Sequence, residues 1–306
     1  MRLVAAVLIA APVVPAFATA RAQTIVSQSR PASHSRTRII MLGTGNPVDD
    51  PDRFGPATVI QVDSTAYLID CGVGVVRRLA AARQAGATTL RSWQLHRLFI
   101  THLHSDHTLG YPDLILSPWT LGESRQSLQV FGPGGTRAMT DHLLAAYAED
   151  IGIRSGAGGD APGVAPPRVD VHEIAPGVVY RDSLVTVTAF AVHHGTWPQA
   201  FGYRFQTPDR DIVISGDAAP PSAIPAQCRG CDVLIHEGGN FHRDSTDAYR
   251  RAFHTSMEDM LEIVRVARPK LLILYHQRPG NNEAGLQFIQ HGYDGRVVVA
   301  KDLDVY

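Results

Sequence analysis

Residues 101–107 read T-H-L-H-S-D-H and decide the fold of the chain. They come directly after a short apolar run that predicts a buried strand. Burying three histidines and an aspartate there without partners would cost on the order of several kcal/mol, which disfavours a purely structural role. The spacing therefore predicts a loop that holds two metal ions. His102 and His104 would face one ion, and Asp106 and His107 would face the other.

Later apolar runs also end in residue types that bind metals. The residues that follow these runs are His193, His194, Asp217, His236, Glu237 and His276. Because ligand-binding residues of mixed folds gather where neighbouring strands end, we expect several of these side chains to converge with the 101–107 loop. The pattern alone leaves open which of the adjacent His193 and His194 is a ligand.

Short strands and helices are mixed along the chain, which predicts an α+β fold. Alternating or continuous apolar runs predict strands over residues 39–42, 57–62, 66–70, 97–101, 128–131, 185–192, 201–205, 212–214, 233–235 and 271–274. Helices are predicted from Gly74 to Ala85 and over residues 136–150, 256–267 and 284–291. Residues 154–168 are rich in Gly, Pro and Ala without periodicity, so they predict a surface loop.

With these residues the chain resembles the metallo-β-lactamase superfamily of metal-dependent hydrolases, whose hallmark is H-x-H-x-D-H. The resemblance covers most of residues 38–304. It implies a four-layer αββα sandwich, with the metal site at the strand ends between two mixed sheets. It also implies two Zn²⁺ ions, with Mn²⁺ or iron as alternatives.

Residue by residue, the resemblance assigns every expected ligand. The first metal receives His102, His104 and His194, the second receives Asp106, His107 and His276, and Asp217 bridges the two. We prefer His194 over His193 because the neighbouring Gly195 frees its backbone, and because the family's histidine usually precedes a turn of this kind.

The expected catalytic residues are Asp106, His254 and Glu237. Ribonuclease-like members of the superfamily carry an H-S-T motif, and this chain has His254-Thr255-Ser256 in that place, with the two hydroxyl residues in the opposite order. We expect His254 to act as a general acid that Glu237 orients, while a metal-bridging hydroxide attacks the substrate.

Two branches of the superfamily share this ligand set, the arylsulfatase-like and the ribonuclease Z type. The segments 118–122 and 131–150 look more like the arylsulfatase-like branch. Ribonuclease Z enzymes of the arm-bearing type carry a long arm before the S-G-D motif, but only eleven residues, 205–215, lie there in this chain. We therefore expect a hydrolase of small anionic esters, either sulfate esters or phosphodiesters. The alternatives are a ribonuclease Z-like tRNA 3′-end endonuclease, a cyclic-nucleotide phosphodiesterase and a non-catalytic metal-dependent binding protein.

The first residues predict export. Residues 1–22 have a charged start, a short apolar stretch and small residues that suit cleavage after Ala20 or Ala22, so a signal peptide is preferred over a retained anchor. Residues 23–37 predict a flexible leader, and residues 38–306 predict the hydrolase domain. The expected location is periplasmic or secreted, with no stable membrane span after cleavage.

The net charge of the chain indicates which classes of partner to expect. Lys and Arg number 28 and Asp and Glu 29. Because residues 1–22 hold two arginines and no acid, the mature chain carries a net charge of −3. This balance and the predicted export argue against nucleic acid as a partner and for a small anionic ester. Formation of a homodimer is left open.

The chain has three cysteines. Cys228 and Cys231 have C-x-x-C spacing, which predicts a small disulfide or an incidental pair, because no second pair completes a structural zinc site. Cys71 follows an apolar strand, so it is expected to be buried in the core.

Overall fold

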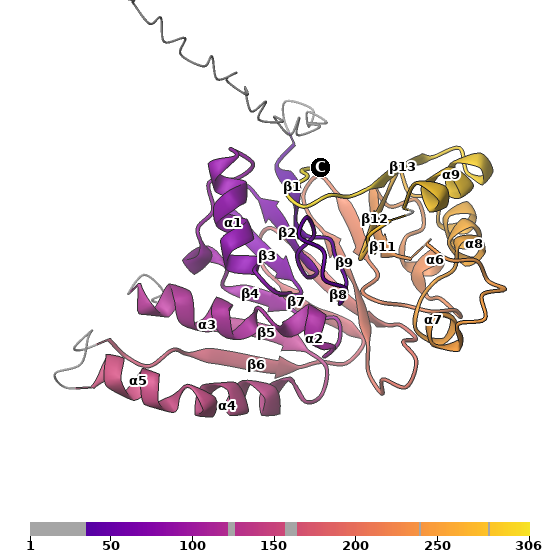
Figure 1. Cartoon of the computed structure of the whole chain (residues 1–306). Helices are drawn as coiled ribbons and strands as arrows, with labels where there is room; N and C mark the ends of the chain where they lie inside the picture. Colours follow the sequence, from indigo (N-terminus) through magenta and orange to yellow (C-terminus); the bar gives the residue numbers. More distant parts are fainter. Residues whose placement is uncertain (1–34, 122–125, 157–163, 239, 281) are drawn as a thin grey trace, which may run out of the picture.

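A computed structural model describes residues 35–121, 126–156, 164–238, 240–280 and 282–306 (Figure 1). The predicted signal peptide and most of the predicted leader lie outside the described residues. Within those residues no helix is long and apolar enough to cross a bilayer. The first strand begins at Thr37, one residue before the predicted domain boundary, and Ser35 and Arg36 already bond to Asp209.

The first half of the chain forms a mixed six-stranded sheet in sequence order. Its strands are β1 (Thr37–Gly43), β2 (Ala57–Val62), β3 (Thr65–Ile69), β4 (Arg97–Phe99), β5 (Leu128–Gly132) and β6 (Val169–Glu173). The first three strands are antiparallel, and the pairs from β3 to β6 are parallel. β2 and β3 are joined by a two-residue turn in which Asp63 has a positive φ of 52°, as tight hairpins require.

The second half forms a mixed seven-stranded sheet in reverse order. Its strands are β7 (Gly177–Arg181), β8 (Thr186–Ala191), β9 (Phe201–Gln206), β10 (Asp211–Ile214), β11 (Val233–Glu237), β12 (Leu271–Tyr275) and β13 (Arg296–Val299). The strands from β7 to β10 are antiparallel, and β10 to β13 are parallel. The parallel strands therefore all end at the same edge.

Helices lie outside both sheets (Figure 1). They are α1 (Val75–Gln84), α2 (Ser105–Thr108), α3 (Tyr111–Thr120), α4 (Thr136–Ala146), α5 (Ala148–Ser155), α6 (Ile224–Gln227), α7 (Ala248–Phe253), α8 (Met257–Ala267) and α9 (Asn282–Gly292), together with a 3₁₀ turn at Ser92–Gln94. The single helix predicted over 136–150 is wrong in detail. Tyr147 has φ −102° and ψ 14°, which divides it into α4 and α5, and α5 continues into the predicted loop.

Three apolar cores separate four layers. In β1, Ile39 and Met41 face the core between the sheets, whereas Ile40 and Leu42 face the core beneath α1 and α3. The alternation follows from the period of two of a strand, and both faces are buried because each has a covering layer. A third core lies between the second sheet and α8 and α9. The expected αββα sandwich is confirmed.

The cysteines fit this packing. Cys228 and Cys231 form a disulfide beside the third core, and Cys71 is buried as expected.

The two sheets are tied together beside the 101–107 loop. The hydroxyl of the fully buried Tyr203 in β9 donates to the carbonyl of Ile100 at 2.7 Å, and the amide of Phe201 donates to the carbonyl of Thr101 at 2.9 Å. These bonds cross from the second sheet to the end of β4, so they fix the start of the loop.

We predict that Tyr203→Phe lowers the free energy of unfolding by about 1–2 kcal/mol, because the Ile100 carbonyl loses its buried donor. Urea denaturation followed by circular dichroism measures the change. Tyr147→Phe, at an exposed tyrosine, is the matched control and should stay within about 0.5 kcal/mol of the wild type. Equal stability of the two variants would show that the Tyr203 bond does not support the loop.

Candidate metal centre

The structure brings all the expected ligand side chains to the strand ends between the two sheets. They are His102, His104, Asp106, His107, His194, Asp217 and His276. All are buried except His104, which is half-buried.

Local structure explains how one short loop supplies four of these side chains. The chain leaves β4, passes His102, and starts α2 with His104 as the residue that caps the helix. The short helix then turns Asp106 and His107 back towards the site. Of the other three candidate ligands, His276 directly follows β12, and His194 and Asp217 lie three residues beyond the ends of β8 and β10.

The first group of ligand atoms centres on His104. Its Nδ1 lies 2.9 Å from Nε2 of His102 and 3.1 Å from Nε2 of His194. An oxygen of Asp217 lies 4.0 Å from each of these Nε2 atoms. Two ligands that share a tetrahedral zinc at normal bond lengths stand roughly 3.3 Å apart, so the four side chains can surround one ion.

The second group lies on the other side of Asp217. Nε2 of His276 is 3.1 Å from Oδ2 of Asp106, and Nε2 of His107 is 3.5 Å from the same oxygen. Asp217 reaches this group as well, because its oxygens lie 3.4 Å from Nε2 of His107 and of His276. Asp217 therefore faces both groups.

Two buried atoms of the cluster are without a hydrogen-bond partner, Nε2 of His107 and Oδ1 of Asp217. Buried polar atoms are normally satisfied, and leaving two of them bare in one cluster is costly. Nitrogen and carboxylate lone pairs that face one another need a cation between them. The donor set of imidazoles and carboxylates suits a divalent metal ion.

Hydrogen bonds behind the ligands fix which nitrogen each ring presents. Thr101 donates its hydroxyl proton to Asp70 at 2.9 Å, so it accepts from Nδ1 of His102 at 3.0 Å. Nδ1 of His107 donates to Asp70 at 2.8 Å. His102 and His107 therefore present a free Nε2 to the centre.

His194 is held in the same way. Its Nδ1 donates to the carbonyl of Phe253 at 2.7 Å, and burial lowers the pKa of His194 to about 4, so the ring is neutral at pH 7. The neighbouring Gly195 has a positive φ of 55°, and a Cβ there would stand 2.2 Å from the Phe253 ring. The close approach of Phe253 thus requires glycine.

Two residues near the ligands were not predicted. Asp70 ends a buried strand run, which is the same signal that pointed to the other carboxylates. Nε1 of Trp197 lies 2.7 Å from Nε2 of His104, and Nδ1 of His104 faces the other imidazoles. A single tryptophan in a loop gives no comparable signal in the sequence.

His254 and Glu237 form a pair beside the cluster. Nδ1 of His254 lies 3.3 Å from Oε2 of Glu237 and 4.0 Å from Asp217. Burial lowers the pKa of His254, but the charges of Glu237 and Asp217 outweigh burial and raise it to about 9. Nδ1 of His254 thus faces Glu237, and the ring lines the cavity.

Two other histidines lie apart from the centre. His193 is exposed beside the buried His194. His236 is buried behind Glu237 because successive residues of β11 point to opposite faces.

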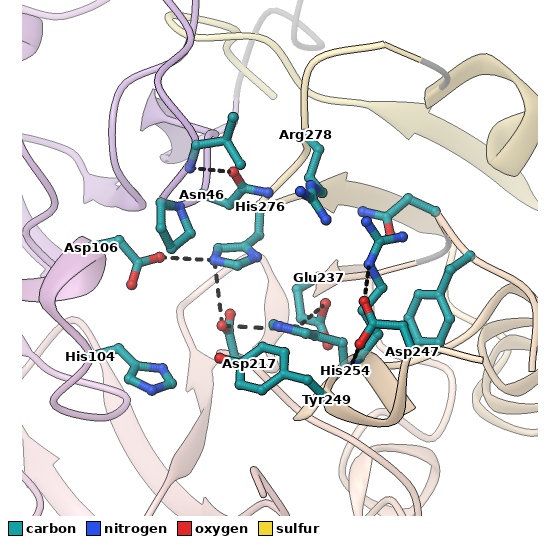
Figure 2. Close-up of a pocket in the computed structure, with 15 residues that line it drawn as sticks. Asn46, His104, Asp106, Asp217, Glu237, Asp247, Tyr249, His254, His276 and Arg278 are labelled. Atoms are coloured by element: carbon teal, nitrogen blue, oxygen red, sulfur yellow. Dashed lines mark hydrogen bonds and ion pairs between the residues drawn. The ribbon is translucent and has the colours of Figure 1, made fainter. Parts of the chain in front are cut away.

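Figure 2 shows the cavity in front of the centre, with His104 and Asp106 on one side and His254 and Glu237 on the other. It has a volume of about 240 Å³, and its rim carries Tyr249, Arg250 and Arg278. The predicted catalytic residues Asp106, His254 and Glu237 all line it.

A family model described as the beta-lactamase superfamily domain matches residues 65–277. The chain belongs to the metallo-β-lactamase superfamily. A protein named Ribonuclease Z from Mycobacterium sp. (strain KMS) is 34% identical over 247 residues, which cover 79% of this chain and 84% of that protein. This homology supports the expected hydrolase class, but it gives no support to the arylsulfatase-like branch that we expected.

Solved structures of this superfamily share the fold. The metallo-beta-lactamase fold protein YhfI from Bacillus subtilis has a TM-score of 0.69 at 17% identity, covering 88% of this chain and 98% of that protein. The short form of human tRNase Z has a TM-score of 0.66 at 22% identity, with the same coverage.

One expectation about partners is wrong. The net charge and the predicted export argue against nucleic acid as a partner. The chain is nevertheless homologous to a protein named Ribonuclease Z. A net charge averages over the whole surface and does not describe the field at one site.

We predict that zinc raises the melting temperature of the metal-stripped protein, because an ion that binds only the folded state stabilises it by about 2.7 kcal/mol at a concentration one hundred times its dissociation constant. Differential scanning fluorimetry across a zinc titration measures the shift. Asp217→Ala should remove most of it, whereas Asp52→Ala, at an exposed aspartate, should keep it. A zinc response that survives in Asp217→Ala would contradict the site.

We predict that Asp70→Asn weakens zinc binding about 10- to 100-fold. One Asp70 oxygen accepts from the Thr101 amide and the other accepts from the Thr101 hydroxyl and His107, but an amide group has only one accepting oxygen. Competition with a chromogenic chelator measures the affinity. Asp63→Asn, at an exposed aspartate outside the centre, is the matched control. Unchanged zinc affinity in Asp70→Asn would show that Asp70 does not orient the ligands.

Proposed function

We propose that the protein is a metal-dependent phosphodiesterase of the ribonuclease Z type that cleaves RNA. The observation that carries the proposal is the His254–Glu237 pair at the edge of the metal centre, together with 34% identity to a protein named Ribonuclease Z. The proposal includes two Zn²⁺ ions. His102, His104 and His194 would hold one, Asp106, His107 and His276 the other, with Asp217 shared.

When bound, the ions would supply an activated water and stabilise negative charge on the phosphate. The side chains of the site would hold the ions together and position the substrate. Asp217 faces both ligand groups and keeps them together, while Asp106 lies at the cavity wall opposite His254. The substrate phosphate is thereby placed between the metal ligands and the imidazolium.

His254 is proposed to protonate the leaving oxygen. Glu237 accepts the Nδ1 proton and keeps the ring charged, so Nε2 can deliver its proton to the departing ribose oxygen. Glu237 is itself fixed, because it accepts from the amides of Thr255 at 3.1 Å and of Ala218 at 3.3 Å. The reversed order of Thr255 and Ser256 leaves the pair intact: Thr255 bonds to the carbonyl of Ala218, and Ser256 caps α8.

The short β9–β10 connection narrows the proposed substrate from RNA in general to short single-stranded RNA ends. Four residues, 207–210, join the two strands, so the connection holds no arm of the kind expected in arm-bearing tRNA enzymes. RNA is therefore bound by the cavity rim itself, and short single-stranded ends suit it best. The periplasmic or secreted location stays a prediction, as does the signal peptide.

We predict that His254→Ala lowers kcat for a single-stranded RNA oligonucleotide by about 10²- to 10⁴-fold, because a ribose oxygen leaves poorly without a proton. The decrease for bis(p-nitrophenyl) phosphate should be far smaller, since nitrophenolate is a good leaving group. Steady-state kinetics with zinc-loaded protein measure both values.

His242→Ala, at an exposed histidine paired with Glu258, is the matched control for this comparison. Equal losses of kcat on both substrates would contradict the role of His254 as a general acid. Zinc-dependent cleavage of an aryl sulfate without cleavage of RNA would contradict the proposed function itself.

A further inference from the structure

Two arginines stand at the rim of the cavity in different electrostatic states. Nε of Arg250 lies 3.3 Å from Asp247, so its charge is largely balanced. Arg278 is exposed, and within the described part of the chain it has no hydrogen bond or ion pair. Figure 2 shows its guanidinium directed into the cavity.

Each carboxylate around the cavity already faces a positive or proton-donating partner. Asp106 and Asp217 face the ligand imidazoles, and Glu237 and Asp247 are paired with His254 and Arg250. Among the described residues that line the cavity, Arg278 is the cation without an anionic partner. A guanidinium binds phosphate through two parallel hydrogen bonds, and its charge does not titrate near neutral pH.

Tyr249 adds an aromatic surface at the same rim. It is 55% exposed, yet its ring is fixed, because it stacks on Phe253 with 4.3 Å between centroids and 17° between planes. The Phe253 ring in turn packs against the His194 ring, with 5.1 Å between the two centroids, and against the backbone of Gly195. One face of Tyr249 is therefore supported from behind while much of the ring remains open to solvent.

The position of Tyr249 indicates which part of an RNA substrate its ring would contact. Its ring centroid lies 6.2 Å from that of His254, the proposed donor to the leaving oxygen. At about 240 Å³ the cavity is smaller than pockets that enclose a whole small-molecule ligand, which start at roughly 300 Å³. It can take the reacting phosphate, while the adjoining nucleotides must lie across the rim.

We propose that Tyr249 and Arg278 form a nucleotide subsite for single-stranded RNA. Tyr249 stacks on the base of the nucleotide that carries the leaving oxygen, and Arg278 binds the phosphate next to the scissile one. Aromatic stacking combined with a basic contact is the usual way of holding single strands without reading their sequence. This subsite rests on the proposed ribonuclease function and assigns its substrate contacts.

The test measures KM and kcat of the zinc-loaded full chain on a single-stranded RNA oligonucleotide at several salt concentrations. Tyr249→Ala should raise KM about tenfold, and Tyr249→Phe should restore it because the ring is kept. Removing the base of the leaving nucleotide should raise the wild-type KM to a similar extent and abolish the difference between wild type and Tyr249→Ala.

Arg278→Ala should raise KM and reduce the slope of log KM against log salt by about 0.7, as expected for the loss of one phosphate contact to a single strand. Arg83→Ala and Tyr147→Ala remove an exposed arginine and an exposed tyrosine elsewhere, and they should match the wild type. If the wild type cleaves RNA but Tyr249→Ala and Arg278→Ala keep its KM and salt slope, the subsite is wrong. If the wild type cleaves no RNA, the proposed function is wrong.

Discussion

Lone pairs of seven side chains face one another in a buried site, and such an arrangement is stable only with positive charge between them. This constraint explains why both sheets contribute to the site, because no single strand end could supply seven such side chains. The 101–107 loop gives four, and β8, β10 and β12 give the others. Asp70 lies behind the ligand loop and orients it by accepting from Thr101 and His107.

The same constraint organises the chemistry around the centre. Asp217 faces both ligand groups, and its charge together with that of Glu237 raises the pKa of His254 despite burial. On the rim, Arg250 is paired and Arg278 has no anionic partner among the described residues, so the rim can receive an anion although the chain as a whole is slightly acidic. The electrostatics of the site, and not the net charge, decide whether a polyanion can bind.

Much of this site could be predicted from sequence because its ligands sit where apolar runs end. Asp70 carries the same signal but was read only as a strand end, since nothing local shows that its carboxylate points to Thr101 and His107. β6 and β7 were missed because each buries little, and β13 follows a helix without a clear alternating pattern. The expectation that nucleic acid is not a partner is wrong because whole-chain charge carries no information about single charges such as Arg278 at the cavity rim.

The most direct test of the two-metal centre is anomalous X-ray diffraction from crystals of the zinc-loaded protein, recorded on both sides of the zinc absorption edge. We expect two peaks, roughly 3.5–4 Å apart, with the Asp217 carboxylate between them and His102, His104 and His194 around the first. One peak alone, or peaks away from Asp217, would contradict it.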